Sequence, residues 1–162
     1  MSDRPTLGLT TGRQAAISVI SGAVISGLVI MAFEAVGSFP PVVPWTVAAL
    51  LALLAVAVAV YSRVLRRRLK EHTVPSQESV TALVLGKTMV MTGAVFAGAH
   101  VIYVIRYAQL IAAPLPAQRV VNGAATIVAA LLLAGAGTLL ERACVVDDGD
   151  DDHEQGGSAS PA

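Results

Sequence analysis

Four long apolar stretches constrain the fold of this chain more than any other feature. They run approximately over residues 15–36, 42–60, 88–105 and 121–140. An α-helix needs about 20 apolar residues to cross ~30 Å of hydrocarbon, and each stretch approaches or reaches that length. With 55% hydrophobic residues and a mean hydropathy of +0.71, the chain is too apolar for a soluble domain of its size. The stretches therefore predict a multi-pass membrane protein.

Together with their polar flanks, these stretches predict an all-α fold, a four-helix transmembrane bundle. The helices are expected at about 15–36, 42–64, 82–107 and 119–142, within a transmembrane domain of residues 15–145. Residues 1–14 form a lead, and residues 146–162 form an acidic tail that we expect to be disordered because it has no apolar residues to bury. The first stretch is longer than the apolar region of a signal peptide, so we interpret it as an uncleaved anchor.

Basic residues indicate the orientation. The side that holds both termini carries nine Lys and Arg residues, whereas the other side carries two. The positive-inside rule therefore predicts cytoplasmic termini and external short loops. The nine are Arg4, Arg13, Arg63, Arg66, Arg67, Arg68, Lys70, Lys87 and Arg142, and the two are Arg106 and Arg119.

Small residues recur along one face of each expected helix, because they are separated by three or four positions or by sums of these numbers. Such faces let helices pack closely in lipid, where no hydrophobic force drives them together. The four seams are Ala16, Ala23, Gly27, Ile30 and Glu34; Ala48, Ala52, Ala55 and Ala59; Lys87, Met91, Ala94, Gly98, Val101 and Ile105; and Gly123, Ala130, Ala134, Gly137 and Glu141.

Four charges near the helix ends suggest how the helices are arranged. If the third helix lies between the first and the fourth, Glu34 can pair with Arg106 at the external end, and Lys87 with Glu141 at the cytoplasmic end. The alternative is that these long side chains reach the headgroups independently of one another.

Three polar residues inside the expected helices form a possible intramembrane site. His100 belongs to a ring-bearing stripe with Phe96, Tyr103 and Tyr107, which indicates either a proton-sensitive or ligand-binding site, or an aromatic packing face. Asn122 and Thr126 are one turn apart and are expected to form interhelical hydrogen bonds.

The basic run at the end of the second stretch is expected to contact anionic lipid headgroups. An ordinary stop-transfer cluster explains the same pattern. Nucleic-acid binding is not expected from a short juxtamembrane run without aromatic partners. The run consists of Arg63, Arg66, Arg67, Arg68 and Lys70.

Catalytic and metal-binding motifs are not recognisable in the sequence. The acidic tail lacks the spacing of a calcium loop, and Cys144, the sole cysteine, has no partner at metal-site spacing. We therefore expect no cofactor, no metal and no enzymatic activity.

Several short motifs resemble an actinobacterial family of uncharacterised small four-helix membrane proteins, a domain-of-unknown-function family. The resemblance covers about residues 4–145 and implies an inner-membrane location without an activity to transfer. Its motifs are Arg4-Pro-Thr-Leu7, the turn Pro40-Pro-Val-Val-Pro-Trp45, the basic end of the second helix, Ala82-Leu-Val-Leu-Gly-Lys87, Ala94-Val-Phe-Ala-Gly98 and Leu139-Leu-Glu-Arg142.

Two classes of function fit these features. The first is a non-enzymatic accessory or scaffold subunit, embedded in the lipid bilayer of the inner (plasma) membrane and packed against another membrane protein or a second copy of itself. Short loops and many small-residue faces favour it. The second is a small homo-oligomeric transporter or channel, which would need a polar path through the helices.

Overall fold

Four α-helices make up the computed structural model, which describes residues 9–38, 40–71, 75–108 and 114–145. Each helix is long and apolar enough to span a membrane. The described residues contain no strand. Residues 1–8 of the lead and the acidic tail 146–162 lie outside the described residues. The helices are α1 (Gly12–Ala35), α2 (Trp45–Lys70), α3 (Ser76–Ala108) and α4 (Pro114–Val145).

Local signals set the two ends of α1. Thr11 and Gln14 form a capping box, in which the Thr11 hydroxyl accepts from the Gln14 N–H at 3.4 Å and the Gln14 amide oxygen accepts from the Thr11 N–H at 3.2 Å. After the last turn, Gly37 adopts a φ of +68°, a conformation that side chains with a Cβ disfavour. The helix therefore begins and ends where the sequence has cap residues.

All four helices extend beyond the ranges expected from hydropathy at one end or the other. α1 begins at Gly12 rather than residue 15, whereas α2 begins at Trp45, later than the expected residue 42. α2 continues to Lys70 rather than residue 64, α3 begins at Ser76 rather than 82, and α4 begins at Pro114 rather than 119. The extra turns contain Arg, Lys, Glu and Gln, which are good helix formers but are not apolar. Hydropathy therefore marked the parts of the helices that suit hydrocarbon, and the helices themselves are longer.

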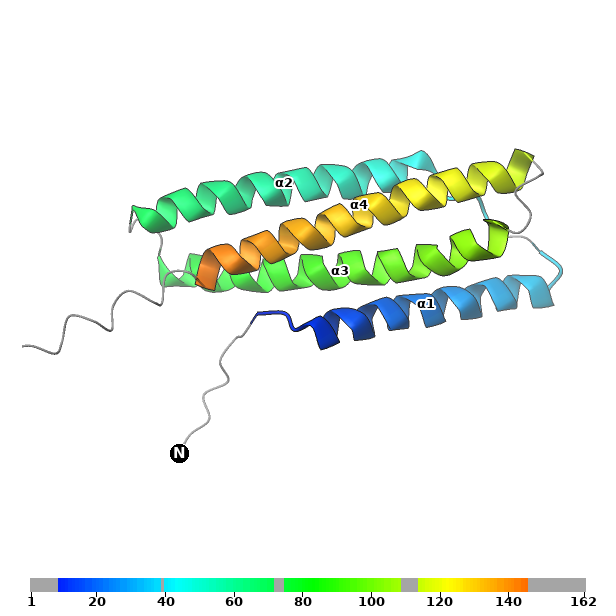
Figure 1. Ribbon diagram of the computed structural model, residues 1–162, viewed down its shortest axis with the longest axis horizontal. Coiled ribbons are helices and arrows are strands. Elements are labelled where there is room, and N and C mark those ends of the chain that lie inside the picture. Colours follow the sequence, from blue (N-terminus) through cyan, green and yellow to red (C-terminus); the bar gives the residue numbers. More distant parts are fainter. Residues whose placement is uncertain (1–8, 39, 72–74, 109–113, 146–162) are drawn as a thin grey trace, which may run out of the picture.

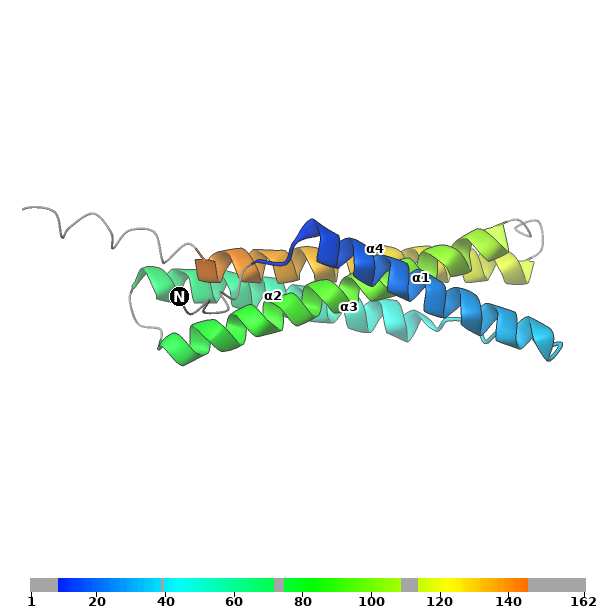
Figure 2. The ribbon, with the colours of Figure 1, turned by 90° about the horizontal axis from the view of Figure 1, so that it is seen from below.

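The helices follow one another across the molecule in the order α1, α3, α4, α2 (Figure 1). α3 packs against both α1 and α4, and α2 packs against α4. The prediction that the third helix lies between the first and the fourth is confirmed. The start of α1, the end of α2, the start of α3 and the end of α4 lie toward the same end of the molecule, which we call the basic end (Figures 1 and 2).

Two buried apolar clusters hold α2, α3 and α4 together. Leu133 and Leu140 of α4 and Leu65 of α2 are completely buried, and α3 contributes Ala97 and Ala82. α1 lies outside this core. It contributes Ile30 to a third cluster, with Tyr103 and Tyr107 of α3.

α1 and α3 approach so closely that backbone meets backbone. A Cβ atom placed on Gly22 would lie 2.1 Å from the Val95 carbonyl oxygen, and one placed on Gly98 would lie 2.0 Å from the Val19 carbonyl oxygen. Both positions therefore require glycine. The expected seam on the first helix is wrong in part. Ile30 is buried, but Gly27 has nothing within 4 Å of the position that a Cβ would occupy.

The contact between α3 and α4 follows the expected seam on α4 but not the one on α3. On α4, Ala130 and Ala134 meet Gly93, and Gly137 meets Gly86. On α3, the expected members Val101 and Ile105 are exposed instead. A helical projection finds small residues that share a face, but it does not identify the face that a neighbour covers.

Candidate functional site

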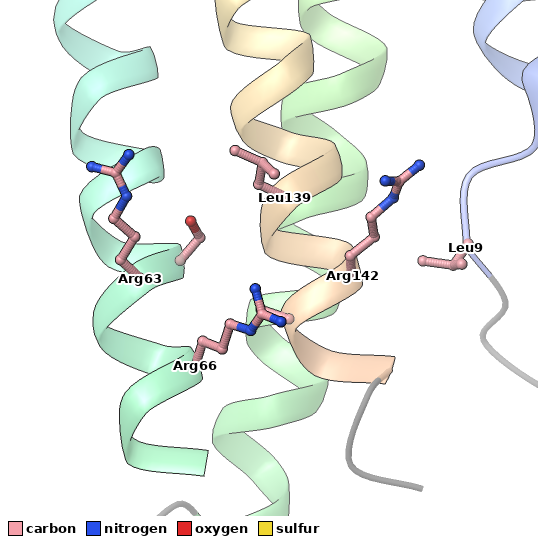
Figure 3. A pocket seen from close by; sticks show the side chains of 7 residues that line it. Leu9, Arg63, Arg66, Leu139 and Arg142 are labelled. Carbon is pink, nitrogen blue, oxygen red and sulfur yellow. The ribbon is translucent and has the colours of Figure 1, made fainter. Parts of the chain in front are cut away.

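A cavity of about 610 Å³ opens at the basic end between α2, α4 and the segment before α1. We call it the arginine pocket, because Arg63 and Arg66 of α2 and Arg142 of α4 line it (Figure 3). Its other lining residues are Leu9, Ser62, Leu139 and Ala143. Two helices that are distant in sequence thus bring three arginines to the lining of one cavity. The side chain of Arg66 extends toward α4, whereas the guanidinium groups of Arg63 and Arg142 point toward opposite sides (Figure 3).

The three pocket arginines differ from the other members of the basic run. Arg68 forms an ion pair with Glu78 at 3.1 Å, which ties the end of α2 to the start of α3. Arg67 is exposed and does not line the pocket, and the side chain of Lys70 lies outside the described part. Among described residues, no carboxylate pairs with Arg63, Arg66 or Arg142.

An apolar groove of about 570 Å³ continues from the arginine pocket along α2 and α4, and the two cavities share Leu139. Small side chains keep the groove open, and Gly135 has nothing within 4 Å of the position of a Cβ. We call this cavity the α2–α4 groove. It is lined by Ala52, Ala55, Val56, Ala59, Leu131, Leu132, Gly135, Ala136, Thr138 and Leu139.

Near the arginine pocket, Glu141 is 2% exposed and its carboxylate accepts two hydrogen bonds from Thr10. The Thr10 N–H lies 2.8 Å from Oε2, and the Thr10 hydroxyl donates to Oε1. Gly86 leaves room for the Glu141 side chain, because a Cβ there would lie 3.1 Å from its Cγ. The expected pair between Lys87 and Glu141 is not among the ion pairs of the described residues.

At the opposite end, the expected pair between Glu34 and Arg106 is present in the structure. The Arg106 Nε and Nη2 atoms donate to Glu34 Oε1 at 2.9 and 2.8 Å. Both side chains are 48% exposed, so water or headgroups also reach them. The pair links α1 to α3 at the end where α1 leaves the bundle.

Three side chains clamp the loop between α1 and α2, a role that no sequence pattern predicted for any of them. Arg119 donates to the Pro40 carbonyl at 2.7 Å, Asn122 to the Val43 carbonyl at 2.8 Å, and the Tyr103 hydroxyl to the Pro41 carbonyl at 3.5 Å. The Arg119 guanidinium also lies 4.8 Å from the centre of the Tyr107 ring. The prolines were the available signal, because a chain rich in proline leaves carbonyl groups for side chains to bind.

The expected intramembrane polar site does not assemble as one site. The His100 Nδ1 atom lies 2.9 Å from the Phe96 carbonyl oxygen of its own helix, and its ring stacks on Phe96 at 6.1 Å. The Thr126 hydroxyl donates to the Asn122 carbonyl, also in its own helix. Asn122 bonds the loop before α2, so none of the three joins two helices directly.

The described part of the chain holds no group of three or more His, Cys, Asp or Glu side chains able to share a metal ion. Cys144 is half-buried and carries a free thiol. The arginine pocket is therefore the place where the described chain gathers charge around a cavity.

A family model described as a protein of unknown function, DUF3180, matches residues 15–148. The chain belongs to this family. The expected resemblance to a family of unknown function is thereby confirmed. The match covers α1 of this DUF3180 protein from residue 15 onward and the whole of α2, α3 and α4, and it carries no activity to transfer. No curated protein and no solved structure matches the chain.

Proposed function

We propose that this DUF3180 protein is a non-enzymatic accessory or scaffold subunit of an assembly in the inner (plasma) membrane, and that α1 contacts its partner. The observation that supports this most directly is the open position of α1. Only 11% of its span is buried within the chain, against 44% for α4. A helix so little buried has most of its surface available to lipid or to another protein.

The flank of α1 beside its contact with α3 suits another helix. Gly27 lies five positions after Gly22, which is at the α3 contact, and is therefore about 140° around the helix from it. Ala16 and Ala23 share the face of Gly27, and nothing lies within 4 Å of a Cβ placed on Gly27. Helices associate in lipid through faces of this kind, because small residues let backbones approach. We name Ala16, Ala23 and Gly27 the α1 outer seam.

The proposed orientation places the basic end in the cytoplasm. Arg63, Arg66 and Arg142 lie at that end, whereas Arg106 lies near the opposite end, with Glu34 of α1. Short loops with an excess of Lys and Arg stay on the cytoplasmic side of a membrane. Both termini would then be cytoplasmic.

The test is gentle purification of the tagged chain from its native membrane, followed by native mass spectrometry. We expect a stoichiometric second protein to co-purify with the chain. Gly27→Leu should abolish this co-purification, because the larger side chain would keep a partner helix from approaching the α1 outer seam closely. Ala57→Leu is the matched control, because Ala57 is an exposed small residue on α2. Equal retention of the second protein by both variants would contradict the role of α1.

A small homo-oligomeric transporter or channel is the alternative outcome of the same measurement. It would appear as a homo-oligomer without a second protein, and the next step would be transport assays on His100 variants. The geometry favours the accessory role, because His100 and Thr126 bond to carbonyls of their own helices rather than lining a shared path.

A further inference from the structure

We propose that the arginine pocket and the α2–α4 groove together bind one anionic phospholipid. The phosphate would lie among Arg63, Arg66 and Arg142, and one acyl chain would lie along the groove. This inference is independent of the partner proposed for α1, because the groove lies on α2 and α4.

Charge complementarity supports a phosphate at this position. Three like charges around one cavity repel one another, and an anion among them removes that repulsion. The guanidinium group offers several donors in a planar fork that matches the oxygens of a phosphate. Within the described chain no carboxylate fills this role for Arg63, Arg66 or Arg142.

The groove supports a lipid rather than a soluble anion. The arginine pocket and the groove together extend from Arg63 to Ala52, which are 11 residues apart, or about 16 Å at ~1.5 Å per residue. Half of the ~30 Å hydrocarbon core is of the same size, so the pocket and the groove together span about one leaflet. A soluble phosphate would explain the arginines, but it would leave unexplained an apolar groove that begins at Leu139, directly beside them.

The first experiment compares lipids and arginine variants. The purified full-length chain is titrated with phosphatidylglycerol or phosphatidylcholine, and bound lipid is counted by native mass spectrometry. We expect one tightly bound phosphatidylglycerol. Arg142→Gln should weaken it about fivefold, as follows from ~1 kcal/mol for each basic residue near an anionic headgroup. Arg67→Gln removes the same charge outside the pocket and should leave binding within about twofold.

Two outcomes of this comparison would overturn the proposal. Equal weakening by Arg142→Gln and Arg67→Gln would show a diffuse basic surface instead of a built pocket. Equal affinity for phosphatidylglycerol and phosphatidylcholine would show that the headgroup charge has no role. The acidic tail also carries six carboxylates within residues 147–154. Binding that appears only after removal of residues 146–162 would show that the tail excludes lipid in the full chain, which also overturns the proposal.

The second experiment tests the acyl chain. Gly135→Leu should fill the groove without striking the protein, and should weaken binding about fourfold for each methylene that it displaces, from ~0.8 kcal/mol per buried methylene. Gly27→Leu is the matched control, because Gly27 is also open but lies on α1. If Gly135→Leu binds like Gly27→Leu while glycerol phosphate displaces the lipid, the pocket is a site for a soluble anion and the proposal fails.

Discussion

Glu141 is 2% exposed near the end of a helix that is suited to a membrane, and its environment explains how such a group is tolerated. A buried carboxylate without donors is costly, whereas hydrogen bonds to it are among the stronger ones in proteins. Thr10 supplies two donors from a segment that lies outside the four helices. The segment before α1 is thereby fastened to the end of α4.

Replacement of Thr10 by Val should therefore destabilise the chain although Thr10 lies outside the helices. Thr10→Val removes the hydroxyl donor to a buried carboxylate, and we expect a loss of about 1–3 kcal/mol in the free energy of unfolding. The measurement is unfolding by sodium dodecyl sulfate in mixed micelles. Thr81→Val is the control, because the exposed Thr81 hydroxyl bonds only to the Gln77 carbonyl of its own helix. Equal stability of both variants would contradict the importance of the Thr10 contact.

The ion pair between Glu34 and Arg106 is exposed, in contrast to the buried contact between Thr10 and Glu141. Its two side chains are half exposed, so its ion pair is screened and is worth about 1 kcal/mol or less. It orients α1 against α3 at one end more than it stabilises the protein. The buried Thr10–Glu141 contact at the other end mainly stabilises the protein.

At the scale of the element, α1 is the helix whose position depends on a single neighbour. Its contact with α3 rests on two glycines that allow the backbones to meet, Gly22 and Gly98. Most of the large apolar side chains of α1 are exposed, whereas Ile30 packs against α3. A change at the glycine contact should therefore release α1 without unfolding the core of α2, α3 and α4.

Gly22→Ala and Gly27→Ala should have opposite effects on stability. The added methyl at Gly22 would strike the Val95 carbonyl, and overpacking of this kind costs about 1–3 kcal/mol. The same change at Gly27 meets open space and should stabilise the helix by about 0.5–1 kcal/mol. Thermal unfolding in detergent distinguishes the two. A Gly22→Ala variant as stable as the Gly27→Ala variant would contradict the close approach of α1 and α3.

At the scale of the whole molecule, the order α1, α3, α4, α2 requires the loop between α1 and α2 to cross the end of the bundle (Figure 1). Arg119, Asn122 and Tyr103 bind the carbonyl groups of that loop as it crosses. The clamp thus joins the peripheral helix to the core at the end opposite the arginine pocket.

The proposed orientation predicts which end reacts from outside the cell. The test uses two single-cysteine variants, Ser38→Cys and Glu71→Cys, each in a Cys144→Ser background. Ser38 lies at the end opposite the basic end and Glu71 lies at the basic end, and both positions are exposed. A membrane-impermeant maleimide should label Ser38→Cys in intact cells, and should label Glu71→Cys only after the membrane is permeabilised. Both variants should react in detergent. The reverse pattern in intact cells would show that the basic end is external.

Features that depend on residues close together in the chain could be predicted from the sequence. Four apolar stretches predicted four helices, because hydropathy over about 20 residues is a local property. The cluster of arginines at one end was equally visible. The charges Glu34 and Arg106 even predicted that α1 and α3 are neighbours, since an ion pair between two helix ends leaves few arrangements.

Which helix faces meet, and which cavities remain between them, depends on how the helices pack and could not be predicted from the sequence. Gly22 rather than Gly27 faces α3, because close packing depends on the shapes of both surfaces, and a projection of one helix contains only one of them. Arg142 joins Arg63 and Arg66 across about 80 residues of sequence because α2 and α4 pack side by side. A pocket made by two helices is a property of their contact, and no pattern within either helix contains it.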